Sequence, residues 1–179
     1  MVEENLVKLH FYKMNLSKKQ CDELINYSVV DYEDRFTNMH QYSDKLFEPN
    51  NDVKKSIKEY CYKKLNLVIS NVKVGVLKYE KGGFFKRHID RNSKYDFNKD
   101  FLYNINVRLN DDYDGGEFYL NDKPFYKPVG EIYHYKSSEY HEVKQVTKGV
   151  RYTALFYIRE RDVLENLNNK NLLWIKTIG

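Results

Sequence analysis

The sequence has few of the residues that stabilise small secreted proteins or build fibres. Its 179 residues include two cysteines, three prolines and eight glycines. Cys21 and Cys61 are too few and too far apart for a disulfide framework or a zinc site, which fits a reducing compartment. The low proline and glycine content excludes a collagen-like or low-complexity chain. We therefore expect a globular protein in which both thiols are buried in the core.

Long apolar runs are also absent. No stretch approaches the roughly 20 residues needed to cross a bilayer. The first residues, 1–4, lack the basic region and apolar stretch of a signal peptide. We therefore expect a cytoplasmic protein without a membrane segment. The abundance of Lys, Asn and Tyr points to an AT-rich genome, such as that of a virus or phage.

Neither sign of charge dominates the chain. Lys and Arg number 30 against 26 Asp and Glu, which leaves a net charge of +4. Lysine pairs occur at 18–19, 54–55 and 63–64, all on segments that we expect to be helical. Because the outer face of such a helix is solvated, these pairs indicate exposed helix surfaces more than a nucleic-acid site.

Hydrophobic periodicity divides the chain into a helical part and a strand-rich part. Apolar residues recur at helical spacing over 16–29, behind a Ser17 N-cap, and from Asn51 or Asp52 to about Leu65. From residue 67 the spacing changes to alternation or to β-branched and aromatic clusters. These strand-like segments lie at 67–79, 101–109, 116–120, 131–135 and 151–158. Helices followed by many short strands predict an α+β, mainly β, fold: a jelly roll with the N-terminal helices packed on one sheet.

We interpret residues 1–179 as a single domain. Residues 1–66 would form helical support with a loop, 67–162 the jelly-roll core, and 163–179 a C-terminal extension. Two unperiodic segments, 31–50 and 91–100, are candidates for mobile lids over a substrate, and surface insertions are the alternative.

Four residues form a chemically suggestive constellation in the strand-rich part. His88-Ile89-Asp90 follows a predicted strand, His141 comes 53 residues after His88, and Arg151 comes ten residues later. Two imidazoles and one carboxylate leave adjacent metal positions open, as in non-haem Fe(II) oxygenases, whereas structural zinc needs four protein ligands. Arg151 offers a permanently charged fork that suits a carboxylate. His10, His40 and His134 have no partner at ligand spacing.

The order and spacing of four runs around these residues resemble a known family. They are Lys78-Tyr79-Glu80-Lys81-Gly82 with His88-Ile89-Asp90, then Val107-Arg108-Leu109-Asn110-Asp111-Asp112-Tyr113-Asp114-Gly115-Gly116-Glu117-Phe118, then Tyr135-Lys136-Ser137-Ser138-Glu139-Tyr140-His141-Glu142-Val143, then Thr147-Lys148-Gly149-Val150-Arg151-Tyr152. The stretch from Lys78 to Asp162 resembles the catalytic core of the 2-oxoglutarate- and Fe(II)-dependent dioxygenases, in the prolyl 4-hydroxylase-like branch.

The resemblance implies a double-stranded β-helix core and a role for each matching residue. His88, Asp90 and His141 would be the catalytic iron ligands, and Arg151 would bind the distal carboxylate of 2-oxoglutarate. Tyr79 would contact the same co-substrate or would be a core aromatic residue. The implied cofactor is Fe(II), with 2-oxoglutarate and O2 as co-substrates and ascorbate as a reductant. The implied reaction is hydroxylation, most plausibly of a prolyl residue in a peptide or protein.

Some positions depart from the family pattern and leave the substrate open. Phe85 stands where many prolyl hydroxylases have a tyrosine, Arg108 replaces a common aromatic residue, and Tyr157 stands where collagen-type enzymes have tryptophan. Alternative substrates are a lysyl residue, a free amino acid or a nucleobase. Nucleobase demethylases carry a second arginine six residues after the first, where this chain has Tyr157, which argues against nucleic acid. A non-catalytic jelly-roll binding module that contains a metal is the remaining alternative.

Overall fold

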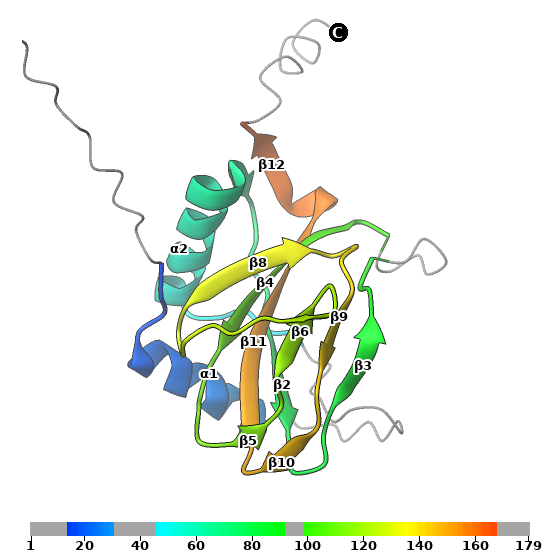
Figure 1. The fold of residues 1–179 in the computed structure, drawn as a ribbon. Helices are drawn as coiled ribbons and strands as arrows, with labels where there is room; N and C mark the ends of the chain where they lie inside the picture. The colour runs from blue at the N-terminus through cyan, green and yellow to red at the C-terminus, as the bar shows by residue number, and fades with distance from the viewer. Residues whose placement is uncertain (1–13, 31–45, 92–98, 168–179) are drawn as a thin grey trace, which may run out of the picture.

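The structure is a computed structural model that describes residues 14–30, 46–91 and 99–167 (Figure 1). Its helical elements are α1 (Lys18–Val30), α2 (Asn51–Tyr60), the π-helical turn η1 (Cys61–Leu65) and the 3-10 turn η2 (Glu160–Asp162). Its strands are β1 (Leu67–Ile69), β2 (Gly75–Tyr79), β3 (Phe85–His88), β4 (Phe101–Arg108), β5 (Asp114–Gly115), β6 (Phe118–Leu120), β7 (Lys123–Pro124), β8 (Ile132–Lys136), β9 (His141–Val143), β10 (Val146–Lys148), β11 (Arg151–Arg159) and β12 (Val163–Asn166). The predicted mainly β fold is confirmed.

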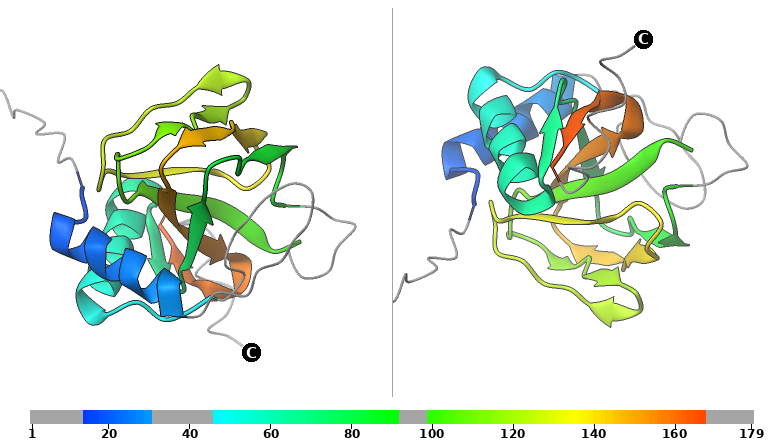
Figure 2. Two further views of the ribbon diagram at one scale, coloured as in Figure 1. Left: turned by 90° about the horizontal axis from the view of Figure 1, so that it is seen from below. Right: turned by 90° about the horizontal axis from the view of Figure 1, so that it is seen from above.

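Two antiparallel four-stranded sheets form the body of the molecule. The major sheet has the order β2-β11-β4-β8, and the minor sheet has the order β3-β9-β6-β7. Two short pairs, β10 with β5 and β1 with β12, complete the strand pairing. The views from below and above show the helices on one side of the major sheet and the minor sheet on the other (Figure 2). This is the jelly roll with N-terminal helices on one sheet that the sequence predicted.

The second helix begins where a side chain can satisfy its free backbone donors. The Asn50 side chain accepts a hydrogen bond from the Val53 backbone N–H at 2.9 Å, so Asn50 is the cap, one residue before the predicted start. The predicted apolar face is confirmed, because its residues are all buried: Val53, Ile57, Tyr60, Cys61 and Leu65. The last turn widens to a π-helix that ends at the left-handed Asn66.

The major sheet buries two different kinds of side chain on its two faces. On β11, Ala154, Phe156 and Ile158 join the aliphatic cluster under the helices. The alternate residues Arg151 and Thr153 face the minor sheet and line a cavity there. Because successive strand residues point to opposite faces, one strand serves both the core and the cavity.

Small features of the sequence prediction also appear in the structure. Cys21 and Cys61 are both buried, with 1% and 0% of their surface exposed. Gly115 and Gly116 adopt positive φ values of 73° and 65°, as expected for a turn or bulge. The predicted strand 67–79 is divided into β1 and β2. Among the described residues, no helix is long and apolar enough to cross a membrane.

Candidate metal centre

Strand pairing brings the two histidines of the predicted constellation together. His88 is the last residue of β3, and His141 is the first residue of the neighbouring strand β9. The two residues are direct cross-strand partners in the antiparallel register. Their rings are tilted by 53°, with centroids 4.2 Å apart. The long sequence separation therefore becomes a direct contact.

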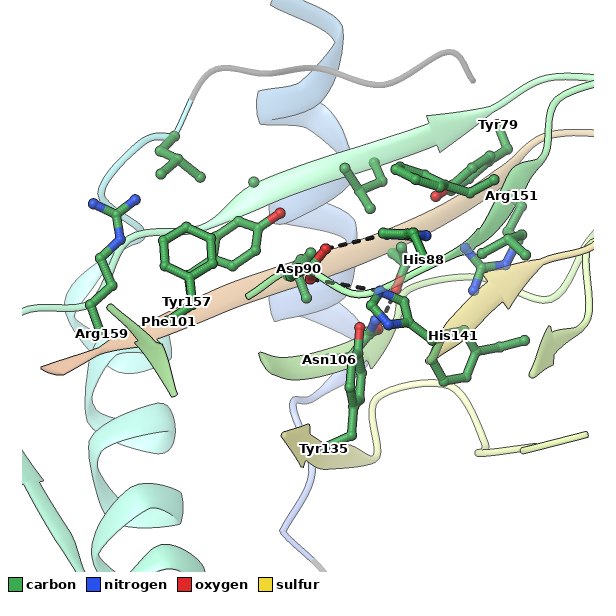
Figure 3. A pocket seen from close by; sticks show the side chains of 18 residues that line it. Tyr79, His88, Asp90, Phe101, Asn106, Tyr135, His141, Arg151, Tyr157 and Arg159 are labelled. Carbon is green, nitrogen blue, oxygen red and sulfur yellow. Dashed lines mark hydrogen bonds and ion pairs between the residues drawn. The ribbon is translucent and has the colours of Figure 1, made fainter. Parts of the chain in front are cut away.

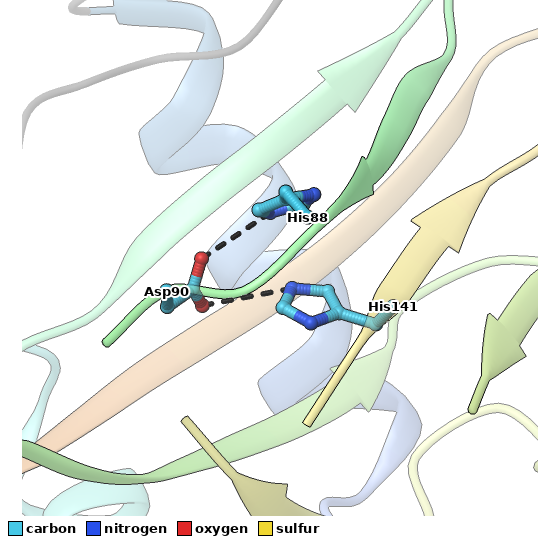
Figure 4. A group of neighbouring side chains, drawn as sticks. All are labelled: His88, Asp90 and His141. Atoms are coloured by element: carbon cyan, nitrogen blue, oxygen red, sulfur yellow. Dashed lines mark ion pairs between the residues drawn. The ribbon is translucent and has the colours of Figure 1, made fainter. Parts of the chain in front are cut away.

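Asp90 completes a group of three side chains just beyond the end of β3 (Figure 4). Its Oδ1 lies 3.2 Å from Nε2 of His88, and its Oδ2 lies 3.6 Å from Nε2 of His141. One donor atom from each residue lies within 4.8 Å of the others. Donor atoms held about 2.1 Å from an ion on neighbouring corners of its coordination shell lie about 3 Å apart. The spacing is therefore close to that of a metal-binding face.

Backbone carbonyls orient both imidazoles toward this face. Nδ1 of His88 is 2.7 Å from the Lys86 carbonyl oxygen, and Nδ1 of His141 is 3.0 Å from the Glu139 carbonyl oxygen. Since a carbonyl can only accept, each Nδ1 donates its proton. In the neutral ring this leaves the lone pair on Nε2, the nitrogen that faces Asp90.

Two buried polar residues hold the Asp90 carboxylate in place. The Asn104 side chain donates to Oδ2 of Asp90 at 2.7 Å, and the Ser137 hydroxyl donates to Oδ1 of Asn104 at 3.2 Å. The Ser137 carbonyl accepts the backbone N–H of Asp90 at 3.0 Å. Asn104 and Ser137 are both fully buried. Such outer hydrogen bonds fix the orientation of a ligand before any ion arrives.

The local electrostatics favour the protonation states that bind a metal. Burial would raise the pKa of Asp90, but the hydrogen bonds with His88 and Asn104 and the attraction of the imidazoles in their protonated form outweigh it, so the pKa is lowered. Burial lowers the pKa of His141, against the opposing effect of the Asp90 charge. A carboxylate and a neutral imidazole are both metal ligands.

A buried, unmatched arginine lies in the same cavity as the three donors (Figure 3). Arg151 is only 3% exposed, and its Nε and Nη1 have no hydrogen-bond partner among the described residues. Burying donors of a charged group without a partner costs free energy. An anion bound next to the guanidinium would remove this cost. A Cβ on Gly116 would lie 2.9 Å from Cδ of Arg151, so this glycine also makes room for the arginine side chain.

Tyrosine side chains form much of the remaining wall. Tyr79 is 1% exposed, and Cζ of Arg151 lies 5.2 Å from the centre of its ring, an arrangement that positions the guanidinium. Burial raises the pKa of Tyr135 well above its ordinary value, so its hydroxyl stays protonated in the cavity. Phe85 stacks on the ring of His88, with centroids 3.9 Å apart.

The sequence interpretation missed most of the polar residues around the donors. Asn104, Asn106, Tyr135, Ser137 and Thr153 are all buried in this region, and none was singled out by role. A signal was present, since Asn104 and Asn106 share one face of an otherwise apolar strand and Thr153 shares the face of Arg151. A polar residue repeated at a spacing of two in an apolar strand marks a cavity-facing side.

Of the other histidines and the two candidate lids, the described residue that lines the cavity is Leu46, from the segment 31–50. His134 lies on the helix-facing side of β8, where its Nδ1 is 2.8 Å from the Tyr60 hydroxyl. His10 and His40 lie outside the described residues, as do 31–45 and 92–98, which are most of the two candidate lids.

The cavity has a volume of about 280 Å³ and lies between the two sheets. It combines a three-donor face, which would leave positions open on a bound ion, with a buried cation that can hold a carboxylate. The donor set and the orphaned guanidinium therefore fit an iron ion accompanied by a small dicarboxylate.

Comparisons with known proteins agree with this geometry. The 2OG-Fe(II) oxygenase superfamily matches residues 74–159. A PKHD-type hydroxylase of Aliarcobacter butzleri (strain RM4018) is 28% identical over 109 residues, covering 51% of this chain and 48% of the relative. The chain thus spans about half the length of this curated relative.

Two solved structures share the fold. A prolyl-4-hydroxylase of Pseudomonas putida has a TM-score of 0.62 at 16% identity and covers 82% of this chain and 89% of its own. The 2OG complex of a viral collagen prolyl hydroxylase from Paramecium Bursaria Chlorella virus-1 has a TM-score of 0.60 at 20% identity, with coverage of 80% and 91%. The core is therefore a double-stranded β-helix of the prolyl 4-hydroxylase type.

The matched segment contains all five residues that the sequence singled out for the site. Residues 74–159 of this chain match the 2OG-Fe(II) oxygenase superfamily, and the fold around them is similar to that of a prolyl 4-hydroxylase.

Proposed function

We propose that this protein is an Fe(II)- and 2-oxoglutarate-dependent dioxygenase that hydroxylates a C–H bond of a prolyl residue in a peptide or protein. His88, Asp90 and His141 would bind the iron, and Arg151 would bind the distal carboxylate of 2-oxoglutarate. The observation that carries the proposal is the orphaned guanidinium of Arg151 in the cavity that the three donors share.

The reaction balances with the proposed co-substrates. 2-Oxoglutarate, O2 and a C–H bond give succinate, CO2 and a hydroxyl group, and the bound iron with its co-substrates supplies the oxidising power. One oxygen atom enters the new succinate carboxylate, and the other enters the substrate. Ascorbate keeps the iron reduced between turnovers.

The protein's own residues supply binding, orientation and the exclusion of water. The Arg151 fork would fix one end of the co-substrate, with Tyr79 against the guanidinium and Tyr135 as a hydroxyl donor nearby. The Tyr135 hydroxyl would supply the contact that Phe85, which stands where many prolyl hydroxylases have a tyrosine, cannot make. Both side chains line the same cavity. Asn104 and Ser137 hold Asp90 so that the donor set needs little rearrangement. The aromatic wall keeps bulk water from the reacting atoms.

The choice of a prolyl residue rests on the fold relatives. Both solved structures are described as prolyl hydroxylases, and one is described as acting on collagen. A peptide is therefore the proposed partner, and the cavity lining beyond the three donors includes the partly exposed residues Tyr157 and Arg159.

The test is succinate release together with a peptide screen. Purified protein should be stripped of metal first, because later first-row metals outcompete Fe(II) at such ligands. Protein reloaded with Fe(II) should convert 2-oxoglutarate to succinate under air with ascorbate, and should add the mass of one oxygen atom to a proline-containing peptide. Metal binding without succinate would indicate a non-catalytic module. An oxidised lysyl residue, amino acid or nucleobase would keep the dioxygenase and overturn the prolyl assignment.

A further inference from the structure

A second arginine lines the same cavity at the other end of β11. The residues of β11 that line the cavity are Arg151, Thr153, Leu155, Tyr157 and Arg159. Eight residues of extended strand at about 3.3 Å each place the Cα atoms of the two arginines roughly 26 Å apart. A five-carbon dicarboxylate held at Arg151 cannot span that distance. A co-substrate bound at Arg151 therefore does not occupy Arg159.

Arg159 is held beside an aromatic pair at the end of the cavity away from Arg151. Its Cζ lies 4.9 Å from the centre of the Phe101 ring, and that ring lies 4.8 Å from the ring of Tyr157. The register of β4 and β11 shifts at this point, which places Phe101 opposite Arg159. In Figure 3 the two rings lie between Arg159 and Asp90, and Arg151 lies on the opposite side of Asp90.

Arg159 has no ion-pair partner among the described residues, although Asp100 and Glu160 are close to it along the strands. Asp100 pairs with Arg161 at 3.5 Å, and Glu160 pairs with Arg91 at 3.0 Å. No carboxylate of the described residues lies within ion-pair distance of Arg159. Acidic neighbours that are paired elsewhere leave this guanidinium available to a ligand.

The charged residues that line the space next to Arg159 are mostly basic. A further cavity of about 250 Å³ shares Tyr157 and Arg159 with the first and adds Lys73, Arg161 and Asp162. Three of its charged residues are basic and one is acidic. A substrate group that reaches this smaller cavity therefore meets a net positive lining, which favours an anionic group.

We propose that Arg159 binds a carboxylate of the peptide substrate, so that peptides with an acidic residue close to the hydroxylated position are preferred. This inference rests on the proposed function. The planar fork of arginine matches a carboxylate, and the neighbouring rings pack against the apolar part of the bound chain. A nucleic acid fits less well, because its repeated phosphates need several available cations. Arg161, the other arginine of the smaller cavity, already pairs with Asp100.

The test measures binding without turnover. The protein is loaded with Zn(II) and 2-oxoglutarate, and fluorescently labelled peptides with blocked ends are titrated by anisotropy. Each peptide has a central proline and one glutamate, and its partner has glutamine at the same place. We expect at least one glutamate position to bind about tenfold more tightly than glutamine, as for a hydrogen bond to a charged group. A further peptide with a free C-terminal carboxylate distinguishes that source from an acidic side chain.

Two variants assign the effect to Arg159. In Arg159→Gln the preference for glutamate should disappear, and in Arg159→Lys part of it should return. Arg161→Gln removes the same charge from a residue that is already paired, so the preference should remain. Unchanged melting temperatures would show that each variant is folded.

Three results would overturn the proposal. They are equal binding of glutamate and glutamine peptides at every position, equal loss of preference in Arg161→Gln, or tight Arg159-dependent binding of a labelled single-stranded oligonucleotide without any acidic preference. Succinate release by the wild-type protein is measured separately. Its presence with no acidic preference would reject only the carboxylate site, and its absence would reject the dioxygenase itself.

Discussion

The two faces of the major sheet are built from the same strands but from different chemistry. Toward the helices, β4 and β11 present Ile105, Val107, Phe156 and similar apolar residues that are almost completely buried. Toward the minor sheet, the alternate positions present asparagine, threonine, tyrosine and Arg151 around a cavity. One face stabilises the fold through apolar burial, and the other tolerates an unpaired charge and open space. Stability and chemistry are thus separated by a single residue step along a strand.

The largest expected effect is the loss of a metal donor on the cavity face. His88→Ala should lower succinate release by more than about a hundredfold, because even outer-shell partners of metal ligands are worth 10–100-fold. The melting temperature of the metal-free protein should change little, since His88 is partly exposed. His134→Gln is the matched control on the helix face and should retain the release. Equal activity of wild type and His88→Ala would contradict the assigned site.

The helix face should respond in the opposite way. Phe156→Ala should lower the free energy of unfolding by about 3–5 kcal/mol, because it leaves a cavity in a packed core. Tyr157→Ala, one residue further and beside open space, should lower it by less than half as much. Denaturant titration of both variants measures the difference. Similar losses at the two positions would remove the distinction between the faces.

Arg151 should raise the affinity for 2-oxoglutarate without stabilising the folded protein. Arg151→Gln should raise the KM for 2-oxoglutarate about 10–100-fold, as expected for loss of a hydrogen bond to a charged group. Arg151→Lys should be intermediate, because it keeps the charge and loses the fork. Without 2-oxoglutarate, the melting temperature of Arg151→Gln should equal or exceed that of the wild type, since a buried unpaired charge is gone. A large drop in melting temperature would make Arg151 a structural residue.

Asn104 should tune the metal affinity through Asp90. Asn104→Leu keeps the side-chain volume but removes the donor to Asp90, and we expect about tenfold weaker Mn(II) binding. Calorimetric titration with Mn(II) measures this. Asn106→Leu is the control, because the Asn106 side chain accepts from Thr153 and not from a metal donor. Equal weakening in both variants would show a general disturbance of β4.

The smallest effect concerns the pH dependence of stability at His134. Burial lowers the pKa of this histidine below its ordinary 6.5, against the charge of Glu139. His134 then binds a proton more readily in the unfolded chain than in the folded one. The neutral side chain therefore contributes its full stability above the pKa of the unfolded state, and this contribution falls as the pH drops toward the pKa of the folded state. His134→Gln should flatten the fall in urea midpoint between neutral and mildly acidic pH. An unchanged slope would mean that His134 does not titrate differently on folding.

The sequence was sufficient for the fold class and for naming the candidate donors that lie together in the structure, because both depend on local signals. Clusters of β-branched and aromatic residues marked the long strands, and the H-x-D triplet lies at a strand end where i and i+2 reach one side. The chain order alone could not show that His88 and His141 are cross-strand partners, since that register is set by distant packing.

Other parts of the site depend on three-dimensional surroundings. Ser137 and Asn104 look like ordinary polar residues in the sequence, and their role appears only when β4 and the segment after β8 meet Asp90. Arg159 belongs to none of the motifs that the sequence analysis described. The role proposed for Arg159 rests on the register shift that places it opposite Phe101. It also rests on Asp100 and Glu160, which pair with other arginines.

The most direct test of the central claim is a calorimetric titration of 2-oxoglutarate into protein with and without Mn(II). If the donor triad and Arg151 build one site, 2-oxoglutarate should bind tightly to the Mn(II)-loaded wild type. It should bind much more weakly to metal-free protein, to His88→Ala and to Arg151→Gln. Binding of the same strength in all four samples would show that the guanidinium and the three donors do not act on one ligand.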